Sequence, residues 1–250
     1  MKHIIISGAN QGIGYYMARE LLQAGYTVTA LDLAIGNLSR LPGNILPLIC
    51  DVSDAARVES CVKESVERFG SVDCAIHNAC MCTFGPMEST GDATYRQVFD
   101  VNYLGALNLT RAVLAYMKAE NSGKIIFTSS GVGVTGFVNI SPYASTKGAI
   151  ESLAKCLNIE YADSGIHFHI FHPPLTNTAS AAPLPVPKEF MADPEKVGAG
   201  LAKNINKKSF IICHSLGQKM QTMLCYLFPI KMGGLMSKMT KAYASRRENG

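Results

Sequence analysis

The stretch His3-Ile-Ile-Ile-Ser-Gly-Ala-Asn-Gln-Gly-Ile-Gly14 decides the fold. A short apolar run, typical of a buried strand, leads directly into a glycine cluster, and a segment of helical period follows over residues 12–24. Glycines let the backbone turn tightly and approach a pyrophosphate, whose charge is held by amides at the start of the helix. An acidic residue, Asp32, ends the next strand-like run, as it does in dinucleotide-binding βαβ units. The sequence therefore predicts a dinucleotide site at this turn.

The rest of the chain alternates between strand-length apolar runs and longer segments of helical period. The strand-like runs cover residues 4–7, 27–31, 45–50, 74–77, 124–128 and 167–171. This alternation is typical of parallel strands joined by crossover helices. It predicts an α/β fold with a doubly wound sheet in a single domain.

Composition and charge narrow the class of protein. The chain has 250 residues, 48% of them hydrophobic and 17% charged, which is ordinary for a soluble enzyme. Eight cysteines at irregular spacing and a start without a signal-peptide pattern favour free thiols in a reducing cytoplasm. We expect no metal, because the pair Cys80 and Cys82 has no second pair at ligand spacing. The net charge of +4 comes from the last 37 residues. The sequence has no basic run interleaved with aromatic residues, so we expect no nucleic-acid partner.

A second motif, Tyr143-Ala-Ser-Thr-Lys147, carries acid-base chemistry. If this segment is helical, Tyr143 and Lys147 lie one turn apart on one face. A fixed ammonium near a phenol favours the phenolate, so we expect the pKa of Tyr143 to fall and the tyrosine to act as a general base. Ser130 lies thirteen residues before the tyrosine, at the end of a strand-like run.

The residue at the end of the second strand selects the cofactor. The carboxylate of Asp32 can accept hydrogen bonds from both hydroxyls of an adenosine ribose, whereas it would repel the 2′-phosphate of NADP. Gln11 and Leu33, where a phosphate-binding Arg or Lys could stand, carry no charge. NAD is therefore the predicted cofactor.

Several independent motifs now stand in the order and spacing of a known family. These are the glycine cluster, Asp51-Val52, Asn78-Ala79, Asn102, Ser130 and Tyr143 with Lys147. Over residues 3 to about 178 the chain resembles the short-chain dehydrogenase/reductase (SDR) family. The resemblance implies a Rossmann-type, doubly wound parallel sheet of about seven strands within residues 1–213. Residues 214–250 would then form a helical, basic and amphipathic C-terminal extension.

The resemblance also implies roles for individual residues. Tyr143 would exchange the proton, Lys147 would stabilise the phenolate and bond the nicotinamide ribose, Ser130 would bind the substrate oxygen, and Asn102 would hold a water molecule. The expected cofactor contacts are Gly8, Asn10, Gln11, Gly12, Ile13, Gly14, Asp32, Asp51, Val52, Asn78, Ala79, Tyr143, Lys147, Pro173 and Thr178.

Two departures from the family pattern concern the cofactor. Where the family has Asn-Asn-Ala-Gly, this chain has His77-Asn78-Ala79-Cys80. Cys80, which has a side chain, must therefore approach the cofactor as closely as the family's glycine does. The usual Pro-Gly after the sixth strand is Pro173-Pro174, which removes a backbone donor. Neither departure touches the Ser, Tyr and Lys positions.

These features predict an NAD-dependent dehydrogenase that acts on a secondary alcohol or its ketone. The apolar loop over residues 179–187 and the methionine-rich tail favour a lipophilic small-molecule substrate, such as a steroid or a bile acid. The alternatives are a 3-oxoacyl carrier-protein reductase and, from another class, an NAD-sensing or scaffold protein with an idle site. From the resemblance we also expect a homodimer or homotetramer, formed through the helices over residues 104–120 and 143–162.

The C-terminal extension carries two apolar stripes. Met220, Met223, Leu224 and Leu227 form the first, and Leu235, Met236, Met239 and Tyr243 form the second. We predict two amphipathic helices, interrupted at Pro229 and at Gly233-Gly234. The stripes either pack on the enzyme or a partner subunit and roof the substrate pocket, or they anchor the protein to a membrane surface. The second hypothesis uses the flanking cations Lys219, Lys231, Lys238, Lys241, Arg246 and Arg247.

Overall fold

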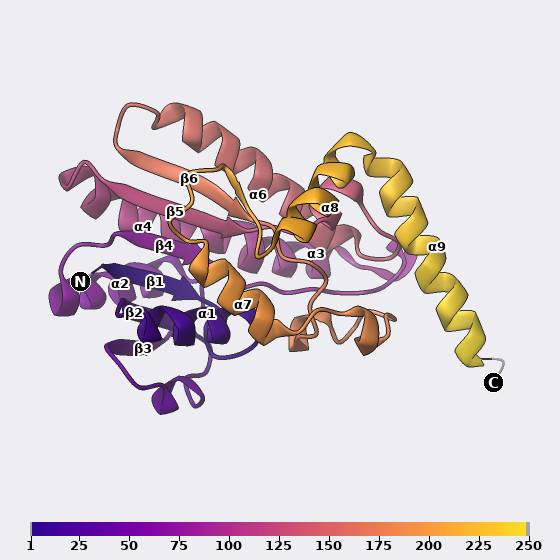
Figure 1. Ribbon diagram of the computed structural model, residues 1–250, viewed down its shortest axis with the longest axis horizontal. Coiled ribbons are helices and arrows are strands. Elements are labelled where there is room, and N and C mark those ends of the chain that lie inside the picture. The colour runs from indigo at the N-terminus through magenta and orange to yellow at the C-terminus, as the bar shows by residue number, and fades with distance from the viewer. Residues whose placement is uncertain (1, 249–250) are drawn as a thin grey trace.

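The computed structural model describes residues 2–248, with side chains through Tyr243. A single parallel sheet of seven strands forms its centre, with helices on both faces (Figure 1). The strand order is β3-β2-β1-β4-β5-β6-β7. The strands are β1 His3–Ser7, β2 Thr27–Asp32, β3 Ile45–Ile49, β4 Cys74–His77, β5 Gly123–Thr128, β6 Ile166–Phe171 and β7 Ile211–Ile212. The predicted Rossmann-type sheet is confirmed.

The crossover helices cover the two faces of this sheet. The α-helices are α1 Gly12–Gln23, α2 Ala55–Phe69, α3 Asp92–Phe99, α4 Gly105–Ala119, α5 Val132–Thr135, α6 Ser141–Glu160, α7 Pro194–Lys203, α8 Leu216–Leu227 and α9 Pro229–Glu248. A π-helical turn, Asp100–Leu104, joins α3 to α4. Buried side chains of α2, α4 and α6 pack on one face of the sheet, whereas those of α1 and α7 pack on the other.

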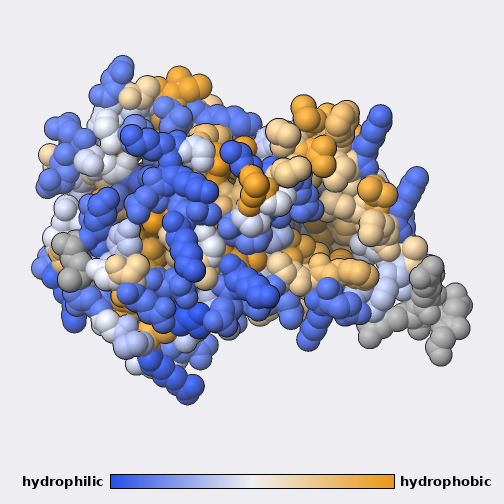
Figure 2. All heavy atoms as spheres, viewed as in Figure 1, coloured by the Kyte–Doolittle hydropathy of each residue, from blue (hydrophilic) through white to orange (hydrophobic). Residues whose placement is uncertain are grey.

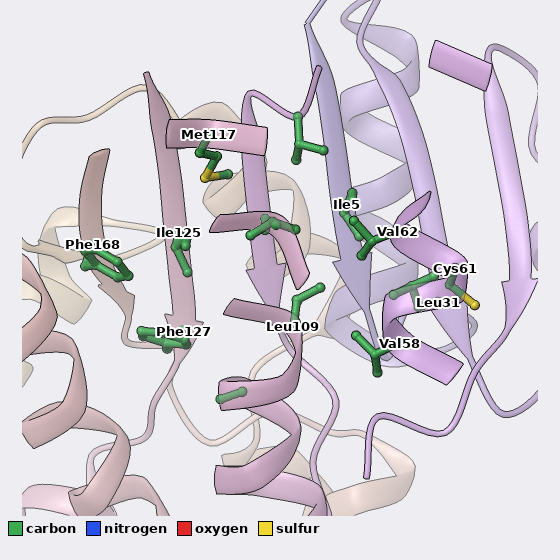
Figure 3. Close-up of a cluster of buried hydrophobic side chains, with 14 of the residues drawn as sticks. Ile5, Leu31, Val58, Cys61, Val62, Leu109, Met117, Ile125, Phe127 and Phe168 are labelled. Carbon is green, nitrogen blue, oxygen red and sulfur yellow. The ribbon is translucent and has the colours of Figure 1, made fainter. Parts of the chain in front are cut away.

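The larger core lies under α2 and α4 (Figure 3). Val58 and Val62 of α2 and Leu109 of α4 meet strand residues such as Ile5 and Phe127, all of them fully buried. The strands read as nearly continuous apolar runs because both faces of the sheet are covered. A rigid sheet buried in this way fixes the positions of the loops that leave its carboxyl edge.

The strand order reverses between β1 and β4, which are direct neighbours. The chain goes from β1 outward to β3 on one side and from β4 outward to β7 on the other. At such a switch point the loops that follow the two central strands diverge, and a crevice opens beyond their carboxyl ends. The glycine-rich turn after β1 and residues 78–82 after β4 border this crevice.

The C-terminal extension forms the two helices α8 and α9, but their boundary differs from the prediction. Pro229 begins α9 as expected, whereas Gly233-Gly234 does not interrupt it. A Cβ atom at Gly233 would lie 2.5 Å from the carbonyl oxygen of Thr135, so this glycine permits close packing of α9 against the end of α5. The prediction of a break was therefore wrong: the glycine serves a contact between helices.

The apolar stripe of α8 points away from the body of the chain. Met220, Met223 and Leu227 are each about 60% exposed, so this stripe does not pack on its own subunit as one hypothesis expected. The opposite face, with Gln218, Thr222 and Cys225, is buried against the enzyme. No helix in the described part of the chain is long and apolar enough to cross a bilayer.

Candidate active site

The turn after β1 approaches the loop after β4 very closely. Gly8 has φ of +66°, and a Cβ atom there would lie 2.6 Å from Cα of Ala79, so both conformation and space require glycine. The backbone amides of Asn78 and Ala79 donate to Oγ of Ser7 at 3.1 and 3.2 Å. The side-chain amide of Asn78 donates to the carbonyl oxygen of Gly8 at 3.0 Å. These bonds hold two predicted cofactor segments together.

His77, one of the departures from the family pattern, is a fully buried link in this network. Its Nδ1 lies 3.1 Å from Oγ of Ser7, and its Nε2 lies 3.1 Å from the carbonyl oxygen of Asn102. Burial, reinforced by the positive charge of Lys147, lowers the pKa of His77 to about 3. The ring is therefore neutral, with Nε2 donating to Asn102 and Nδ1 accepting from Ser7.

Asp32 ends β2 at the edge of the crevice, as predicted. Its Oδ2 accepts a hydrogen bond from the backbone amide of Asn10 at 2.8 Å. The side chain of Asn10 in turn accepts from the amide of Asn37 at 2.9 Å. The carboxylate is thus oriented by the glycine-rich turn, and the next residue, Leu33, is 70% exposed.

Tyr143 and Lys147 lie one turn apart on α6, as the spacing predicts. Nζ of Lys147 lies 5.4 Å from the centre of the Tyr143 ring and donates to the carbonyl oxygen of Thr128 at 2.8 Å. Ser130, two residues beyond β5, lies beside Tyr143, and its hydroxyl acts to lower the pKa of the phenol. The structure therefore brings Ser130, from the loop after β5, together with Tyr143 and Lys147 of α6.

Burial dominates the electrostatics of this group. It raises the pKa of Tyr143 well above its ordinary value, and the Ser130 hydroxyl acts in the opposite direction. Burial also lowers the pKa of Lys147. The expected fall in the pKa of Tyr143 is thus wrong, because burial disfavours the charged phenolate and raises the pKa.

Asn102 lies in the π-helical turn and is completely buried. Its Oδ1 accepts from the amide of Met81 at 2.7 Å, and its Nδ2 donates to Oγ1 of Thr146 at 2.9 Å. Thr146 in turn donates to the carbonyl oxygen of Tyr143 at 2.7 Å. This geometry gives Asn102 a positioning role between the loop after β4 and α6, whereas the water-holding role stays a prediction.

These residues border one cavity of about 1290 Å³. The predicted residues that line it are Gly8, Gln11, Gly12, Ile13, Asp32, Asp51, Val52, Asn78, Ala79, Ser130, Tyr143, Lys147, Pro173 and Thr178. Asn10, Gly14 and Asn102 stand behind this wall rather than in it. The volume exceeds the roughly 300–1,000 Å³ of a typical small-molecule site, so a dinucleotide and a second molecule can share it.

The wall of this cavity has a simple charge pattern. Among the described residues that line it, Asp32, Asp51 and Lys147 are the ones whose side chains carry a charge. Asp32 ends β2 and Asp51 follows β3, on the side where the adenosine would bind, and Lys147 lies beside Tyr143. The remaining wall, including Phe137, the 179–187 loop and α9, is neutral and mainly apolar.

Sequence reasoning missed the polar inner face of α8. Gln218, Gln221 and Thr222 line the cavity, together with Met236 and Thr240 of α9. The hypothesis that the apolar stripes roof the pocket is confirmed for the second stripe, because Leu235, Met236, Met239 and Tyr243 line the cavity. The first stripe is exposed and does not line it. Glutamine and threonine at helical spacing opposite the apolar stripe were the available signal, but an apolar stripe ordinarily marks the buried face.

A buried carboxylate that the sequence analysis also missed connects this roof to α6. Tyr226 of α8 donates to Oε2 of Glu151 at 2.6 Å. Oε1 of Glu151 accepts from Ser129 at 2.8 Å and lies 2.8 Å from Nε2 of His172. Burial alone would raise the pKa of Glu151, but the bonds with His172, Tyr226 and Ser129 outweigh it and hold the pKa below its ordinary value. Among the described residues, no three or more His, Cys, Asp or Glu side chains are grouped so that they could hold a metal ion.

The fold and the site together define the class of this protein. A glycine-rich turn at the switch point of a parallel sheet, with an acidic residue ending β2, forms a dinucleotide site. A serine, a tyrosine and a lysine meet beside it and can exchange a proton with a hydroxyl or carbonyl group. The protein is a nicotinamide-nucleotide-dependent oxidoreductase.

Comparison with known proteins gives the family. The family model for short chain dehydrogenases matches residues 2–188, and the chain belongs to that family. It is similar to the oxidoreductase UcpA of Escherichia coli K12, with 33% identity over 82% of this chain and 80% of UcpA. It is 30% identical to the 3-ketodihydrosphingosine reductase of Bos taurus over 72% of this chain, although the match spans only 58% of the bovine protein. A 3-ketoacyl-(acyl-carrier-protein) reductase of Brucella melitensis, crystallised with NADH, has a similar fold. Its TM-score is 0.77 at 23% identity, over 85% of this chain and 94% of that structure.

Proposed function

We propose that this enzyme uses NAD(H) to interconvert a neutral, lipophilic secondary alcohol and its ketone. The observation that carries the proposal is the charge pattern of the cavity. Beyond Lys147, the described side chains on the substrate side carry no charge. A phosphorylated or carboxylated group placed there would lose its hydration without gaining a fixed opposite charge.

The chain offers a fitting site for the nucleotide. Amides at the start of α1 can hold the pyrophosphate, Asp32 can accept from the adenosine ribose, and Asp51-Val52 lie beside it in the wall. Lys147 can reach a ribose hydroxyl near Tyr143. When bound, the nicotinamide ring supplies the hydride acceptor or donor.

The residues of the chain perform the proton transfer. Ser130 can orient the substrate oxygen next to the phenol, since Ser130 and Tyr143 line the same cavity. With its raised pKa, Tyr143 holds its proton at neutral pH and can donate it to a developing alkoxide during ketone reduction. In alcohol oxidation the same oxygen accepts the proton, and the ammonium of Lys147 stabilises the resulting phenolate.

A preference for NAD over NADP is supported by Asp32 and its surroundings. The carboxylate is fixed by the amide of Asn10 at 2.8 Å, close to where a 2′-phosphate would lie. Leu33 and Gln11, which flank this position, are uncharged. Repulsion between the carboxylate and the phosphate would then oppose NADP.

A 3-oxoacyl carrier-protein reductase is a second candidate, because the extension that roofs the cavity is basic. Lys219, Lys231 and Lys238 are exposed on it and could meet an acidic carrier protein. A clear preference for NADPH, together with activity on carrier-bound substrates, would support this candidate. Tight NADH binding without any turnover would instead support an NAD sensor with an idle site.

The test is a substrate panel followed by NADH absorbance. Neutral steroids and long-chain keto lipids should react with kcat/KM at least about tenfold above phosphorylated ketones, since burying an uncompensated charge costs more than about 1.4 kcal/mol. Bile acids, which the sequence analysis expected on lipophilicity alone, carry a carboxylate and should also react poorly. The proposal fails if charged substrates of similar size react as well as neutral ones.

A further inference from the structure

The exposed side of α8 continues into the start of α9 as one apolar surface. We call it the apolar ridge, formed by Leu216, Met220, Met223, Leu227, Phe228 and Ile230, which are 50–82% exposed. Figure 2 shows hydrophobic side chains gathered over α8 and the start of α9. Single exposed apolar residues are common, but a contiguous set along one helix is typical of an interaction surface.

Residues 216–243, which form α8 and the part of α9 with described side chains, carry four lysines and no acidic residue. Between residues 196 and 247 the sequence has ten lysines and arginines and no aspartate or glutamate. Lys219 lies on α8 next to the ridge, and Nζ of Lys231 lies 5.9 Å from the ring of Phe228. Within the described residues neither lysine forms a salt bridge with a carboxylate. An apolar strip bordered by cations is complementary to the surface of an anionic lipid layer.

A second copy of the chain fits this surface less well. In a two-fold interface the same patch faces itself, so Lys219 and Lys231 of both copies would approach one another, and residues 196–247 offer no acidic side chain to pair with them. An acidic protein partner would account for the lysines but leave the apolar residues unexplained. An anionic lipid surface accounts for both the apolar residues and the lysines that border them.

We infer that the ridge docks the enzyme on the surface of an anionic bilayer, with α8 lying in the interface. The opposite face of this helix, with Gln218, Thr222 and Cys225, lines the active-site cavity, so docking would place the cavity one helix away from the lipid. The inference goes beyond the proposed function and does not depend on it, because vesicle binding can be measured without turnover.

The experiment is co-flotation of the full-length protein with vesicles of phosphatidylcholine alone or mixed with phosphatidylglycerol. Binding is expected only with the mixed vesicles, and raised salt should weaken it. Lys219→Gln combined with Lys231→Gln should weaken binding about 25-fold, since each basic residue near an anionic surface strengthens binding roughly fivefold. The double change Lys63→Gln and Lys118→Gln, on α2 and α4, is the matched control and should leave binding intact.

The apolar half of the ridge is tested separately. Met220→Gln, Met223→Gln and Leu227→Gln together should abolish flotation, whereas Met87→Gln, at a position that is 73% exposed, should not change it. These positions are exposed, so the variants should keep NADH affinity and thermal stability. The inference is overturned if the wild type does not float, or if the apolar variant floats normally. It is also overturned if light scattering shows that the apolar variant has lost a subunit, since a second copy would then cover the ridge. Binding to an acidic carrier protein that needs the lysines but not the apolar residues would overturn it as well.

Discussion

Single residues set the cofactor site, and Asp32 is the one whose effect can be read most directly. Its carboxylate is fixed at the end of β2 by the amide of Asn10. Asp32→Ala should weaken NAD binding and relieve the repulsion of NADP. Loss of charge-assisted hydrogen bonds worth about 1.5–3 kcal/mol corresponds to a roughly ten- to hundredfold change in the ratio of kcat/KM for the two cofactors. Asp54→Ala, which removes the N-cap carboxylate of α2, is a control outside the cavity. An unchanged ratio would move the discriminating contact away from Asp32.

His77 gives a prediction about stability. Its pKa is lowered from 6.5 to about 3, so between these values the unfolded chain binds a proton that the folded chain does not. The free energy of unfolding should therefore not depend on His77 above pH 6.5. On acidification from pH 6.5 toward pH 3 this residue should lower it by up to about 1.4 kcal/mol per pH unit. Urea unfolding of His77→Asn at a series of pH values should show a flatter acid limb than the wild type. The exposed His167→Asn is the control, and equal slopes for both variants would contradict the assignment.

At the scale of elements, the contact between α8 and α6 depends on the buried Glu151. Tyr226→Phe removes the hydroxyl that donates to Glu151 at 2.6 Å. We expect the roof to loosen, with faster proteolysis within α8 and a KM for substrate raised about tenfold or more, because a hydrogen bond to a charged group contributes about 1.5–3 kcal/mol. The affinity for NADH should stay the same. Tyr116→Phe on α4 is the matched control, and an unchanged KM together with unchanged proteolysis would show that the bond does not hold the roof.

The elements also show where sequence reasoning succeeds. The sheet and the positions of Tyr143 and Lys147 followed from apolar periodicity and residue spacing, because parallel strands buried on both faces leave a clear pattern. The uninterrupted α9 helix could not be predicted in this way. Gly233 is typical of a helix break, but here it permits close packing of α9 on Thr135. The Glu151 network was equally hidden, because its four members come from four separate segments and meet only in the folded chain. The pKa of Tyr143 depends on burial, which spacing cannot supply.

For the whole molecule, assembly stays a prediction from the family resemblance. On α4, Ala106, Thr110, Val113 and Met117 are buried in the subunit's own core. Leu107 and Leu114 of α4 stay half-buried, and Leu104, in the turn before α4, is exposed. Light scattering should show at least a homodimer, and Leu107→Glu should dissociate it, since a buried unpaired carboxylate is costly. Met220→Glu, on the apolar ridge, should leave it assembled. A stable and active wild-type monomer would rule out the predicted interface.

The measurement that tests the central claim most directly is the activity of Tyr143→Phe. The change removes the hydroxyl that exchanges the proton and leaves the ring, Lys147 and the nucleotide side of the cavity in place. With the substrate that the panel identifies, kcat should fall about 10²- to 10⁴-fold, while fluorescence titration should give an NADH affinity within a factor of about two of the wild type. A variant that kept a tenth or more of the wild-type kcat would show that Tyr143 is not the proton donor, and the proposed mechanism would be wrong.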